Sequence, residues 1–581
     1  MPGTPWRARL AVLGATTAIL VAACGGAATP TPAPTAAPTA APTAAPTATP
    51  VPFEGLTYPT AGEVDCAAGK YNGKDYAGEL KQIKALDAKT VELTLCTPDV
   101  AFLSKVAFAS VPVFDSDWLA QAIGDGSFLD KPNGTGPYIL KDWTKGDRMV
   151  LEANPNYWGD KPQVPNLVFR WSAEAAQRLV ELKSGAVDGI DNPGTDDIAT
   201  IQADSELRFD PRTALNVFYL GMNNTLKPWD NEKVRQAIAV GIDRNRIVDT
   251  FYPKGSEVAT HFVPCVIPFS CGGSDWYGFD AAAAKKLLAD AGYPNGFKTK
   301  IQYRDVVRGY LPDPAVVAQD LQAQLKANLN IEATIEVQES GTYLDNNAAG
   351  KLDGLFMLGW TGDWPDATNF MDYHFGAGAG KKFGSPYPDI VSALNTGGQT
   401  ADTAARDAAY TQANELIKQH VPMVPIAHSA SGTAWKADVE GAVSSPLGDE
   451  FFFPVKPGTR DTVVWMQNAE PLSLYCPDET DGETIRACIQ IYQGLYTVKV
   501  GGTDPVPALA TECKPNTELT VWTCTLRDGV TYQNGAALDA NDVVTSYSAQ
   551  WDAESPLHKG RTSVFEYWAT LFGGYLNPPP A

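Results

Sequence analysis

The chain has 581 residues, which is too long for one compact core and predicts two or three lobes. Its 45 Lys and Arg residues against 67 Asp and Glu residues give a formal net charge of −22, which argues against nucleic-acid phosphates or anionic lipid headgroups as the main partner. A hydrophobic fraction of 44%, with 14 Trp and 22 Tyr, supplies a substantial core and excludes wholesale disorder.

The N-terminal residues are predicted to be an export signal. Arg7 and Arg9 precede the uncharged, largely apolar run Leu10–Ala23, which ends in small residues directly before Cys24. This order is typical of a signal peptide, and the run is shorter than the roughly 18–20 residues that span a bilayer. Residues 1–23 are therefore predicted to be removed. Cys24 resembles the lipidated cysteine of a bacterial lipobox; the alternative is an ordinary signal peptide with an incidental cysteine.

A low-complexity linker follows the signal. Every residue from Ala27 to Pro50 is Ala, Pro or Thr. None of these can anchor a core, and frequent proline favours an extended spacer. Residues 24–52 are therefore predicted to be the lipid anchor and linker, and residues 53–581 the folded body.

Strand-like and helix-like segments alternate along the body. The strand-like runs are β-branched or alternating and are bounded by Gly, Pro or Asn: 90–96, 166–170, 217–222, 355–360 and 520–526. The helix-like runs are 173–185, 231–239, 281–291, 314–329 and 404–419. Asp280 and Asp313 lie where N-caps belong, and Gly185 and Gly292 lie where helices end. This alternation predicts α/β lobes.

The cysteines of the body are predicted to form disulfides. Apart from Cys24, the nine cysteines leave an even set: Cys66, Cys96, Cys265, Cys271, Cys476, Cys488, Cys513 and Cys524. An even number outside the cytosol favours disulfides, although eight cysteines allow 105 pairings. Pairing of sequence neighbours is the simplest expectation, as for Cys513 with Cys524 across a turn and Cys265 with Cys271 around Pro268. Zinc is the alternative, but no CxxC occurs and the five His residues stand apart from the cysteines.

No catalytic motif is present, so the protein is predicted not to be an enzyme. GxSxG, HExxH and P-loop sequences are absent. Pairs of carboxylates such as Asp363 and Asp366 would suit a glycosidase, but such pairs arise by chance in so acidic a chain. We expect no cofactor and no metal; His374 and His428 are lone histidines, which are more often structural.

Several short blocks, in order, resemble one protein family. They are Asn133–Tyr138 with Trp143, Asn154–Trp158, Leu182–Asp188, Tyr219–Asn224, Val234–Ala237 with Ile242–Arg244, and Gly359–Asp366. Together they resemble the extracytoplasmic solute-binding proteins, family 5, which serve ABC importers of peptides and nickel. The resemblance implies an α/β, two-lobed periplasmic-binding-protein-like fold with a hinge, of type II and of the large peptide-binder class.

The order of the family's blocks is rearranged. Blocks that open the family stand near the end of this chain: Val463–Met466, Ile491–Leu495, Pro507–Ala510, and Leu526–Val530 with Gly535, Ala540 and Asp542–Val544. Residues 71–94 resemble what should follow them. We therefore expect a circular permutation in which residues 461–577 are the family's first stretch. The alternatives are a truncated tandem copy and a fused or misassembled reading frame.

The resemblance also implies the lobes and the ligand site. Lobe I is expected at 53–215 plus 455–577 and lobe II at 220–450, with crossings near 216–222 and 451–456. Asp363 is implied to pair with a ligand's α-ammonium, or alternatively to cap a turn. Trp360 and Trp364 are expected to wall the pocket, with Trp360 equally able to be core. Thr480, Asp481 and Gly482 are implied to form a second ligand-contacting loop, or else a solvated turn.

The predicted function is capture of di- or oligopeptides by hinge closure and their delivery to an ABC permease. The protein is expected to be a monomer anchored by Cys24 to a bacterial cell membrane, in the periplasm or on the outer face, with no nucleic-acid partner. The alternatives are another solute, such as a nickel chelate, an opine or a sugar, or a stalked sensing or adhesion module without a transporter.

Overall fold

The computed structural model describes residues 52–304, 308–377, 379 and 381–578. The predicted signal peptide, the lipidation site Cys24 and the linker up to residue 51 lie outside these residues. Residues Phe53–Ala581 form one unit, distinct from Met1–Pro52, and only this body is described below. Within the described residues, no helix combines the length and hydrophobicity needed to cross a membrane.

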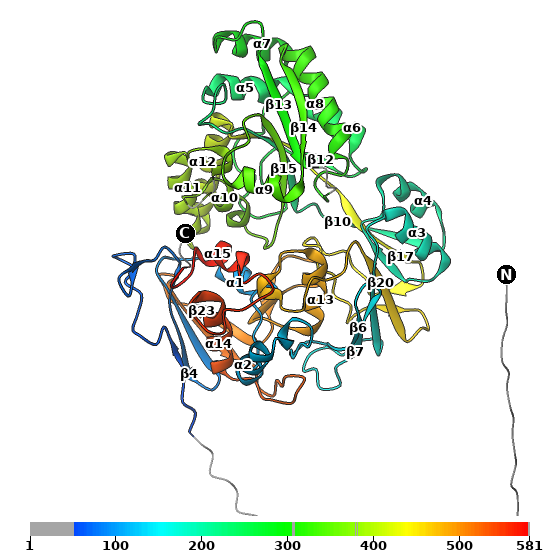
Figure 1. Ribbon diagram of the computed structural model, residues 1–581, viewed down its shortest axis with the longest axis vertical. Helices are drawn as coiled ribbons and strands as arrows, with labels where there is room; N and C mark the ends of the chain where they lie inside the picture. The colour runs from blue at the N-terminus through cyan, green and yellow to red at the C-terminus, as the bar shows by residue number, and fades with distance from the viewer. Residues whose placement is uncertain (1–51, 305–307, 378, 380, 579–581) are drawn as a thin grey trace, which may run out of the picture. The chain divides into compact units, whose positions relative to one another are not determined.

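Two sheets, which we assign to lobe I, bring together both ends of the body (Figure 1). The five-stranded sheet has the order β1 (Thr57–Tyr58), β4 (Leu80–Asp87), β5 (Thr90–Leu95), β24 (Val521–Leu526) and β23 (Ala510–Pro515). The seven-stranded sheet has the order β10 (Leu207–Arg212), β17 (Ser431–Lys436), β9 (Gly189–Asp191), β20 (Thr462–Gln467), β8 (Asn166–Trp171), β7 (Arg148–Ala153) and β6 (Tyr138–Thr144). Strand β20 runs parallel to both β8 and β9, so a late segment of the chain completes a sheet begun by an early one.

The helices of lobe I likewise come from both ends of the body. They are α1 (Phe102–Val106), α2 (Ser116–Asp125), α3 (Ala175–Ser184), α4 (Ile198–Ala203), α13 (Gly482–Ile491), α14 (Ala540–Trp551) and α15 (Glu566–Phe572), with 3-10 turns η1 (Ser127–Leu129), η2 (Thr195–Asp197) and η4 (Cys476–Asp478). Three two-stranded ribbons complete the described strands: β2 (Lys70–Tyr71) with β3 (Lys74–Asp75), β18 (Val439–Glu440) with β19 (Lys456–Pro457), and β21 (Tyr496–Val498) with β22 (Pro505–Pro507).

Lobe II contains the six-stranded sheet, drawn mainly in green in Figure 1. Its order is β12 (Glu257–Val258), β16 (Met423–His428), β11 (Asn216–Gly221), β15 (Leu355–Thr361), β13 (Lys298–Arg304) and β14 (Glu332–Gln338). Its helices are α5 (Glu232–Gly241), α6 (Arg244–Phe251), α7 (Ala281–Asp290), α8 (Pro314–Leu329), α9 (Ser340–Ala348), α10 (Ala367–Phe375), α11 (Pro388–Gly398) and α12 (Thr403–His420), with the 3-10 turn η3 (Lys381–Phe383). Its core is separate from that of lobe I.

The local elements follow the sequence pattern closely. All five predicted strands and all five predicted helices are present, with ends that move by at most a few residues. Asp280 and Asp313 cap α7 and α8 by accepting backbone N–H groups, as predicted. Gly185 ends α3 with a φ of 77°, a left-handed conformation that a glycine adopts without strain.

The chain crosses between the lobes at residues 213–215 and again at 429–430. Strands β10 and β17 pair with each other in lobe I, and β11 and β16 pair with each other in lobe II. The second crossing therefore differs from the position expected near 451–456. The reason is that β17 extends the sheet of lobe I, and Phe452 and Val455 are buried in the lobe I core.

The beginning and the end of the body are neighbours. Asn541 of α14 donates to the Glu54 carbonyl oxygen at 3.0 Å and accepts from the Leu56 backbone N–H at 2.8 Å. The Asp552 carboxylate accepts from the Tyr58 hydroxyl and also from Asn577 Nδ2 at 3.0 Å. A circular permutation requires adjacent ends, because the residues at the two ends of this body would be consecutive in the unpermuted chain.

The eight cysteines of the body form four disulfides, each between neighbours in the sequence. The pairs are Cys66–Cys96, Cys265–Cys271, Cys476–Cys488 and Cys513–Cys524. The last pair joins directly opposed residues of β23 and β24, which the intervening turn had indicated. The disulfide Cys476–Cys488 fixes η4 to α13, the helix that approaches the cavity described next.

Candidate ligand-binding site

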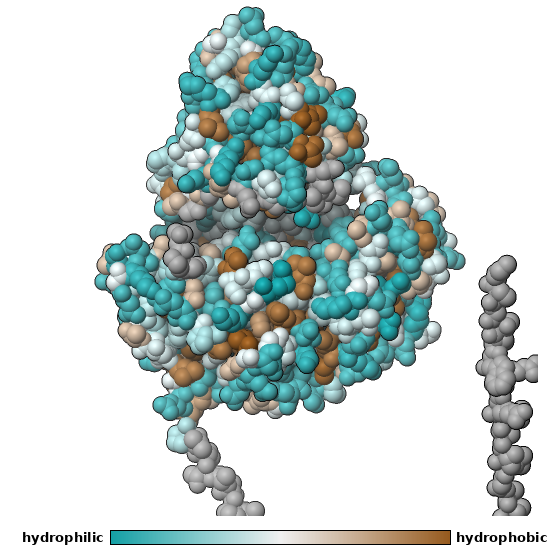
Figure 2. All heavy atoms as spheres, in the orientation of Figure 1, coloured by the Kyte–Doolittle hydropathy of each residue, from teal (hydrophilic) through white to brown (hydrophobic). Residues whose placement is uncertain are grey.

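A cavity of about 530 Å³ lies where the two lobes meet. Its volume falls within the roughly 300–1,000 Å³ of small-molecule sites. Most of the lining is aromatic or aliphatic, including Phe108, Tyr157, Trp158, Phe451 and Tyr492 from lobe I, and lobe II contributes Asp363 and Trp364. The face drawn in Figure 2 is mostly hydrophilic, with scattered hydrophobic patches.

Asp363 lies at the lobe II side of the cavity, in the loop between β15 and α10. Its backbone N–H donates to Asn369 Oδ1 at 3.0 Å, and Asn369 Nδ2 donates to its Oδ2 at 3.3 Å. From lobe I, the Tyr567 hydroxyl donates to its Oδ1 at 2.8 Å. The side chain remains partly accessible. One carboxylate is thus held by both lobes and exposed to the cavity.

Burial raises the pKa of Asp363 to about 7, and the negative charge of nearby Glu566 acts in the same direction. The hydrogen bonds from Tyr567 and Asn369 lower this pKa but do not offset the effect of burial. The charged form is therefore poorly compensated within the protein, and a ligand cation would stabilise it. The helix that follows this loop, α10, is capped by Asp366 and not by Asp363: the Asp366 carboxylate accepts from the Thr368 backbone N–H at 3.0 Å.

The two predicted tryptophans have different surroundings. Trp364 is buried, lines the cavity and packs into the core of lobe I although it belongs to a lobe II segment. Trp360 is not among the described residues that line the cavity. Its ring stacks on Tyr373 with centroids 4.2 Å apart, and its Nε1 donates to Asn369 Oδ1 at 3.0 Å. Trp360 therefore supports Asn369, which in turn holds Asp363.

The predicted second loop, Thr480–Gly482, lies at the start of α13. Asp481 caps that helix by accepting from the Thr484 backbone N–H at 2.8 Å, and burial raises its pKa to about 6. None of the three residues is among the described lining of the cavity. The opposite end of α13 does line it, through Cys488 and Ile489, about 10 Å further along at 1.5 Å per residue.

Sequence analysis missed a second carboxylate in the cavity, Asp449. Its side chain is only 7% exposed. Burial raises its pKa to about 7, Arg486 and Arg212 lower it, and Glu450 and Asp363 raise it. The signal that could have revealed it is the acidic pair Asp449–Glu450 directly before the aromatic run 451–453.

A buried ion network holds the segment that carries Asp449. Arg486 Nε is 2.6 Å from Glu450 Oε2, and Arg486 Nη2 is 2.8 Å from Asp191 Oδ2. Arg212 Nη2 is 2.6 Å from Glu450 Oε1 and 3.0 Å from Asp191 Oδ1. The four side chains come from β9, β10, α13 and the loop before residue 451. They therefore anchor that loop to rigid elements, and breaking such a buried network is costly.

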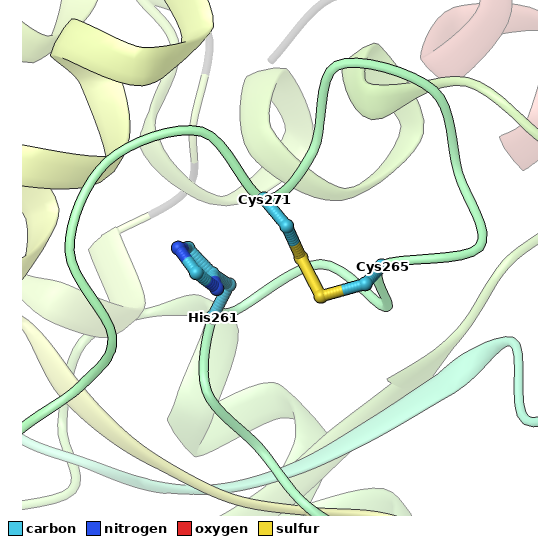
Figure 3. A group of neighbouring side chains, drawn as sticks. All are labelled: His261, Cys265 and Cys271. Atoms are coloured by element: carbon cyan, nitrogen blue, oxygen red, sulfur yellow. A yellow bond between two sulfur atoms is a disulfide. The ribbon is translucent and has the colours of Figure 1, made fainter.

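The histidines are structural in their contacts. His374 Nδ1 lies 2.7 Å from the Phe370 carbonyl oxygen, and His428 Nδ1 lies 2.6 Å from that of Asn216. Burial lowers the pKa of both, that of His428 to about 4. His261 lies beside Cys265 and Cys271 (Figure 3). One potential metal-ligand atom from each of the three residues lies within 4.8 Å of the other two. The two sulfur atoms are joined in a disulfide, so they offer no thiolate to a metal.

Two α/β lobes around an interlobe cavity, with the chain crossing twice, define a two-lobed solute-binding protein. Comparison with known proteins agrees. The profile of the bacterial extracellular solute-binding proteins, family 5 middle, matches residues 35–382 and 504–564. The chain belongs to this family.

Curated relatives are similar over about two thirds of the chain. The dipeptide-binding protein of Escherichia coli K12 is 31% identical over 386 residues, which are 64% of this chain and 71% of that protein. The di/tripeptide-binding protein 1 of Pseudomonas aeruginosa is 29% identical, covering 65% and 72%. The heme-binding protein A of Haemophilus influenzae is 28% identical, covering 65% and 70%.

Solved structures show the same fold. HbpA2 from Haemophilus parasuis aligns with a TM-score of 0.58 and 32% identity, over 65% of this chain and 76% of that one. The periplasmic binding protein DppA from Helicobacter pylori, in complex with the peptide STSA, aligns with a TM-score of 0.58 and 26% identity, over 66% and 75%.

Proposed function

We propose that the protein captures short peptides with a free α-ammonium group in the interlobe cavity and delivers them to the permease of an ABC importer. The observation that carries this proposal is Asp363, a partly accessible carboxylate that forms no ion pair with any cation among the described residues. Relatives that are named for binding dipeptides and tripeptides support the same ligand class. The apolar lining suits side chains of varied shape, and the carboxylate supplies one fixed polar anchor.

Closure of the lobes is the proposed binding step. Asp363 of lobe II reaches Tyr567 of lobe I, Trp364 packs into the lobe I core, and the Val100 backbone N–H lies 3.4 Å from the Gly398 carbonyl oxygen across the lobes. A ligand ammonium beside Asp363 strengthens the set of contacts that only the closed arrangement makes. Binding therefore favours closure through differential affinity for the two arrangements. No catalytic step is proposed.

Heme is a less suitable ligand for this cavity. Among the described lining residues there is no histidine or methionine to ligate iron, and Cys488 is in a disulfide. Tyrosine can also ligate iron, but burial raises the pKa of Tyr157 and Tyr492 and so disfavours the phenolate, and the Tyr496 hydroxyl accepts from the Cys513 backbone N–H. The buried charges are the carboxylates Asp363 and Asp449, which would repel the propionates of a porphyrin. The same charges favour a cationic group, so a peptide N-terminus is the better match.

The proposed cellular arrangement follows from the N-terminal sequence. Export removes residues 1–23, Cys24 carries the lipid, and residues 24–52 space the body from a bacterial membrane, in the periplasm or on the outer face. The protein acts there as a monomer. The proposed circular permutation places residues 461–577 at the family's beginning. The adjacent ends of the body and the parallel pairing of β20 with β8 support it.

Calorimetry with a matched pair of peptides tests the proposed function. Alanyl-alanine and its N-acetyl derivative differ by the charge on the α-nitrogen and by the acetyl group. Two further analogues separate charge from size. N-methylation of the α-nitrogen keeps its charge and adds bulk, whereas a hydroxyl group in place of the ammonium removes the charge at similar size. We expect binding of the free peptide to be weakened at least about 30-fold by acetylation, because a buried charge pair is worth roughly 2–5 kcal/mol when one partner is removed. Equal binding of the two peptides would contradict the role of the ammonium.

A further inference from the structure

Asp449 is a second, unpartnered acid in the ligand cavity. It is 7% exposed and is one of the residues that line the cavity. Among the described residues, none donates a hydrogen bond to its carboxylate or forms an ion pair with it. Burying a charged group without a partner is unfavourable, so an acid in this position is explained by a cation that enters the cavity.

The neighbouring arginines lower the pKa of Asp449, but neither forms an ion pair with it. Arg486 and Arg212 form their ion pairs with Asp191 and Glu450. The remaining donors of Arg486 are also used: Nη1 donates to Gln467 at 3.1 Å, and Nη2 donates to the Gly448 carbonyl oxygen at 2.7 Å. The ion pairs of both guanidinium groups therefore go to Asp191 and Glu450, and Asp449 has no ion pair of its own among the described residues.

The charges of the cavity are divided between its depth and its rim. Four described lining residues carry a carboxylate or an ammonium group: Asp363, Asp449, Asp160 and Lys499. Asp160 and Lys499 are exposed, whereas Asp449 is buried and Asp363 is only partly accessible. The inner part of the cavity therefore has two acids and no base.

Both inner acids lie near the same group, the Tyr567 hydroxyl. That hydroxyl donates to Asp363, and its electrostatic neighbours are Asp363, Glu566 and Asp449. Asp363 also raises the pKa of Asp449, so the two lining carboxylates are close enough to influence each other's charge. On a peptide, the positive charge nearest to the α-ammonium is a cation on the side chain of the first residue.

We propose that Asp449 makes the cavity selective for ligands with two neighbouring positive charges, namely peptides whose N-terminal residue is lysine or arginine. This inference rests on the proposed function, with Asp363 holding the α-ammonium and Asp449 holding the side-chain cation. A diamine has the same pair of charges and is distinguished from a peptide in the test. A peptide with a neutral first residue leaves Asp449 without a partner.

The test is calorimetry at pH 8 and fixed ionic strength with five probes: lysyl-alanine, norleucyl-alanine, alanyl-alanine, alanyl-lysine and cadaverine. Norleucine keeps most of the lysine side chain without its charge. We expect lysyl-alanine to bind wild-type protein about 10-fold or more tightly than norleucyl-alanine, and more tightly than alanyl-lysine. This comparison uses the wild type and does not depend on any variant folding.

Variants then assign the selectivity to one side chain. In Asp449→Asn the preference for lysyl-alanine over norleucyl-alanine is expected to fall to about 2-fold or less. Glu518→Gln is the matched control, because it removes one negative charge at an exposed position outside the cavity. It is expected to keep the wild-type preference, which excludes a general effect of net charge.

The outcomes separate this inference from the proposed function. Binding of alanyl-alanine without a preference for lysyl-alanine overturns the inference and leaves peptide capture intact. Retention of the preference in Asp449→Asn, or tighter binding of alanyl-lysine, also overturns it. Binding of cadaverine alone, dependent on Asp449, supports the two-charge chemistry and overturns peptide capture. Absence of binding by all five probes overturns both.

Discussion

Replacing Asp363 with asparagine is expected to change stability and ligand affinity in opposite directions. The substitution keeps the size of the side chain and removes its charge. The hydrogen bonds around it can persist, because the Tyr567 hydroxyl can accept from an amide as readily as it now donates to the carboxylate. The variant therefore isolates the effect of one partly buried negative charge.

The stability effect follows from the pKa. Asp363 has a pKa of about 7 in the folded protein, against about 3.9 for an unperturbed aspartate. The folded protein therefore holds an extra proton between about pH 4 and pH 7, and stability falls as the pH rises through this range. Above pH 7 the full penalty is at most about 4 kcal/mol, and partial access to water reduces it to about 1–3 kcal/mol. At pH 8 we expect Asp363→Asn to be more stable by this amount, with little difference at pH 4.

The affinity effect has the opposite sign. Removing one partner of a desolvated charge pair costs about 2–4 kcal/mol, which corresponds to a 30- to 1,000-fold weaker Kd for alanyl-alanine. Urea denaturation at pH 8 and pH 4 measures the stability, and titration calorimetry at pH 8 measures the affinity. The ligand-free protein is used for denaturation, because a bound peptide would add its own stabilisation.

Asp366→Asn is the matched control, three residues along the same loop. Asp366 caps α10 and contacts Arg406 Nη2 at 2.9 and 2.8 Å, so its charge is compensated inside the protein. We expect this variant to lose about 1–3 kcal/mol of stability and to keep its affinity within about 3-fold. The reasoning would be refuted if Asp363→Asn bound alanyl-alanine as tightly as the wild type, or if it were destabilised like Asp366→Asn.

Three further predictions concern the surroundings of the site. Arg486→Met leaves Asp191 and Glu450 short of a buried partner and should lower the free energy of unfolding by about 3–5 kcal/mol in urea; a loss below about 1 kcal/mol would show that the network is dispensable. Lowering the pH from 7 to 5 protonates Asp363 and Asp449 while the peptide's α-amino group stays largely protonated, so affinity for lysyl-alanine should fall and binding at pH 7 should release protons. Calorimetry in two buffers of different ionisation enthalpy measures this, and proton uptake would contradict it. Replacing Cys476 and Cys488 with serine opens a loop of sequence separation 12 and should cost about 3 kcal/mol of stability; an unchanged Tm would contradict it.

Local structure was readily predictable because it depends on short-range signals. Asp313 followed by Pro314 marks the start of α8, and the structure places the helix at 314–329 as predicted. Pairing of distant strands is not a local property. Strand β20 lies between β8 and β9, and only the resemblance of the last segment to the family's first could indicate this. The second crossing between the lobes lies at 429–430 and not near 451–456, because the pairing of β17 with β10 has no local signal in the sequence.

The candidate site was predictable where a motif marked it. The block Gly359–Asp366 pointed to Asp363, and the structure places that side chain at the cavity. Asp449 was missed because its importance depends on what surrounds it: two arginines that are already paired, and Tyr567 from a segment more than a hundred residues later. Charge balance in a buried cluster becomes visible only when the chain is folded.

The most direct test of peptide capture is mass spectrometry of what the full chain retains from a defined mixture. The mixture contains di-, tri- and tetrapeptides in equal amounts, each with a free and an N-acetylated form, together with heme, a nickel chelate and simple sugars. The protein is washed, denatured, and its released ligands are identified. We predict that it retains peptides with free N-termini, enriched in lysine or arginine at the first position. Retention of acetylated peptides to the same extent, or of heme, chelate or sugar in place of peptides, would contradict this account.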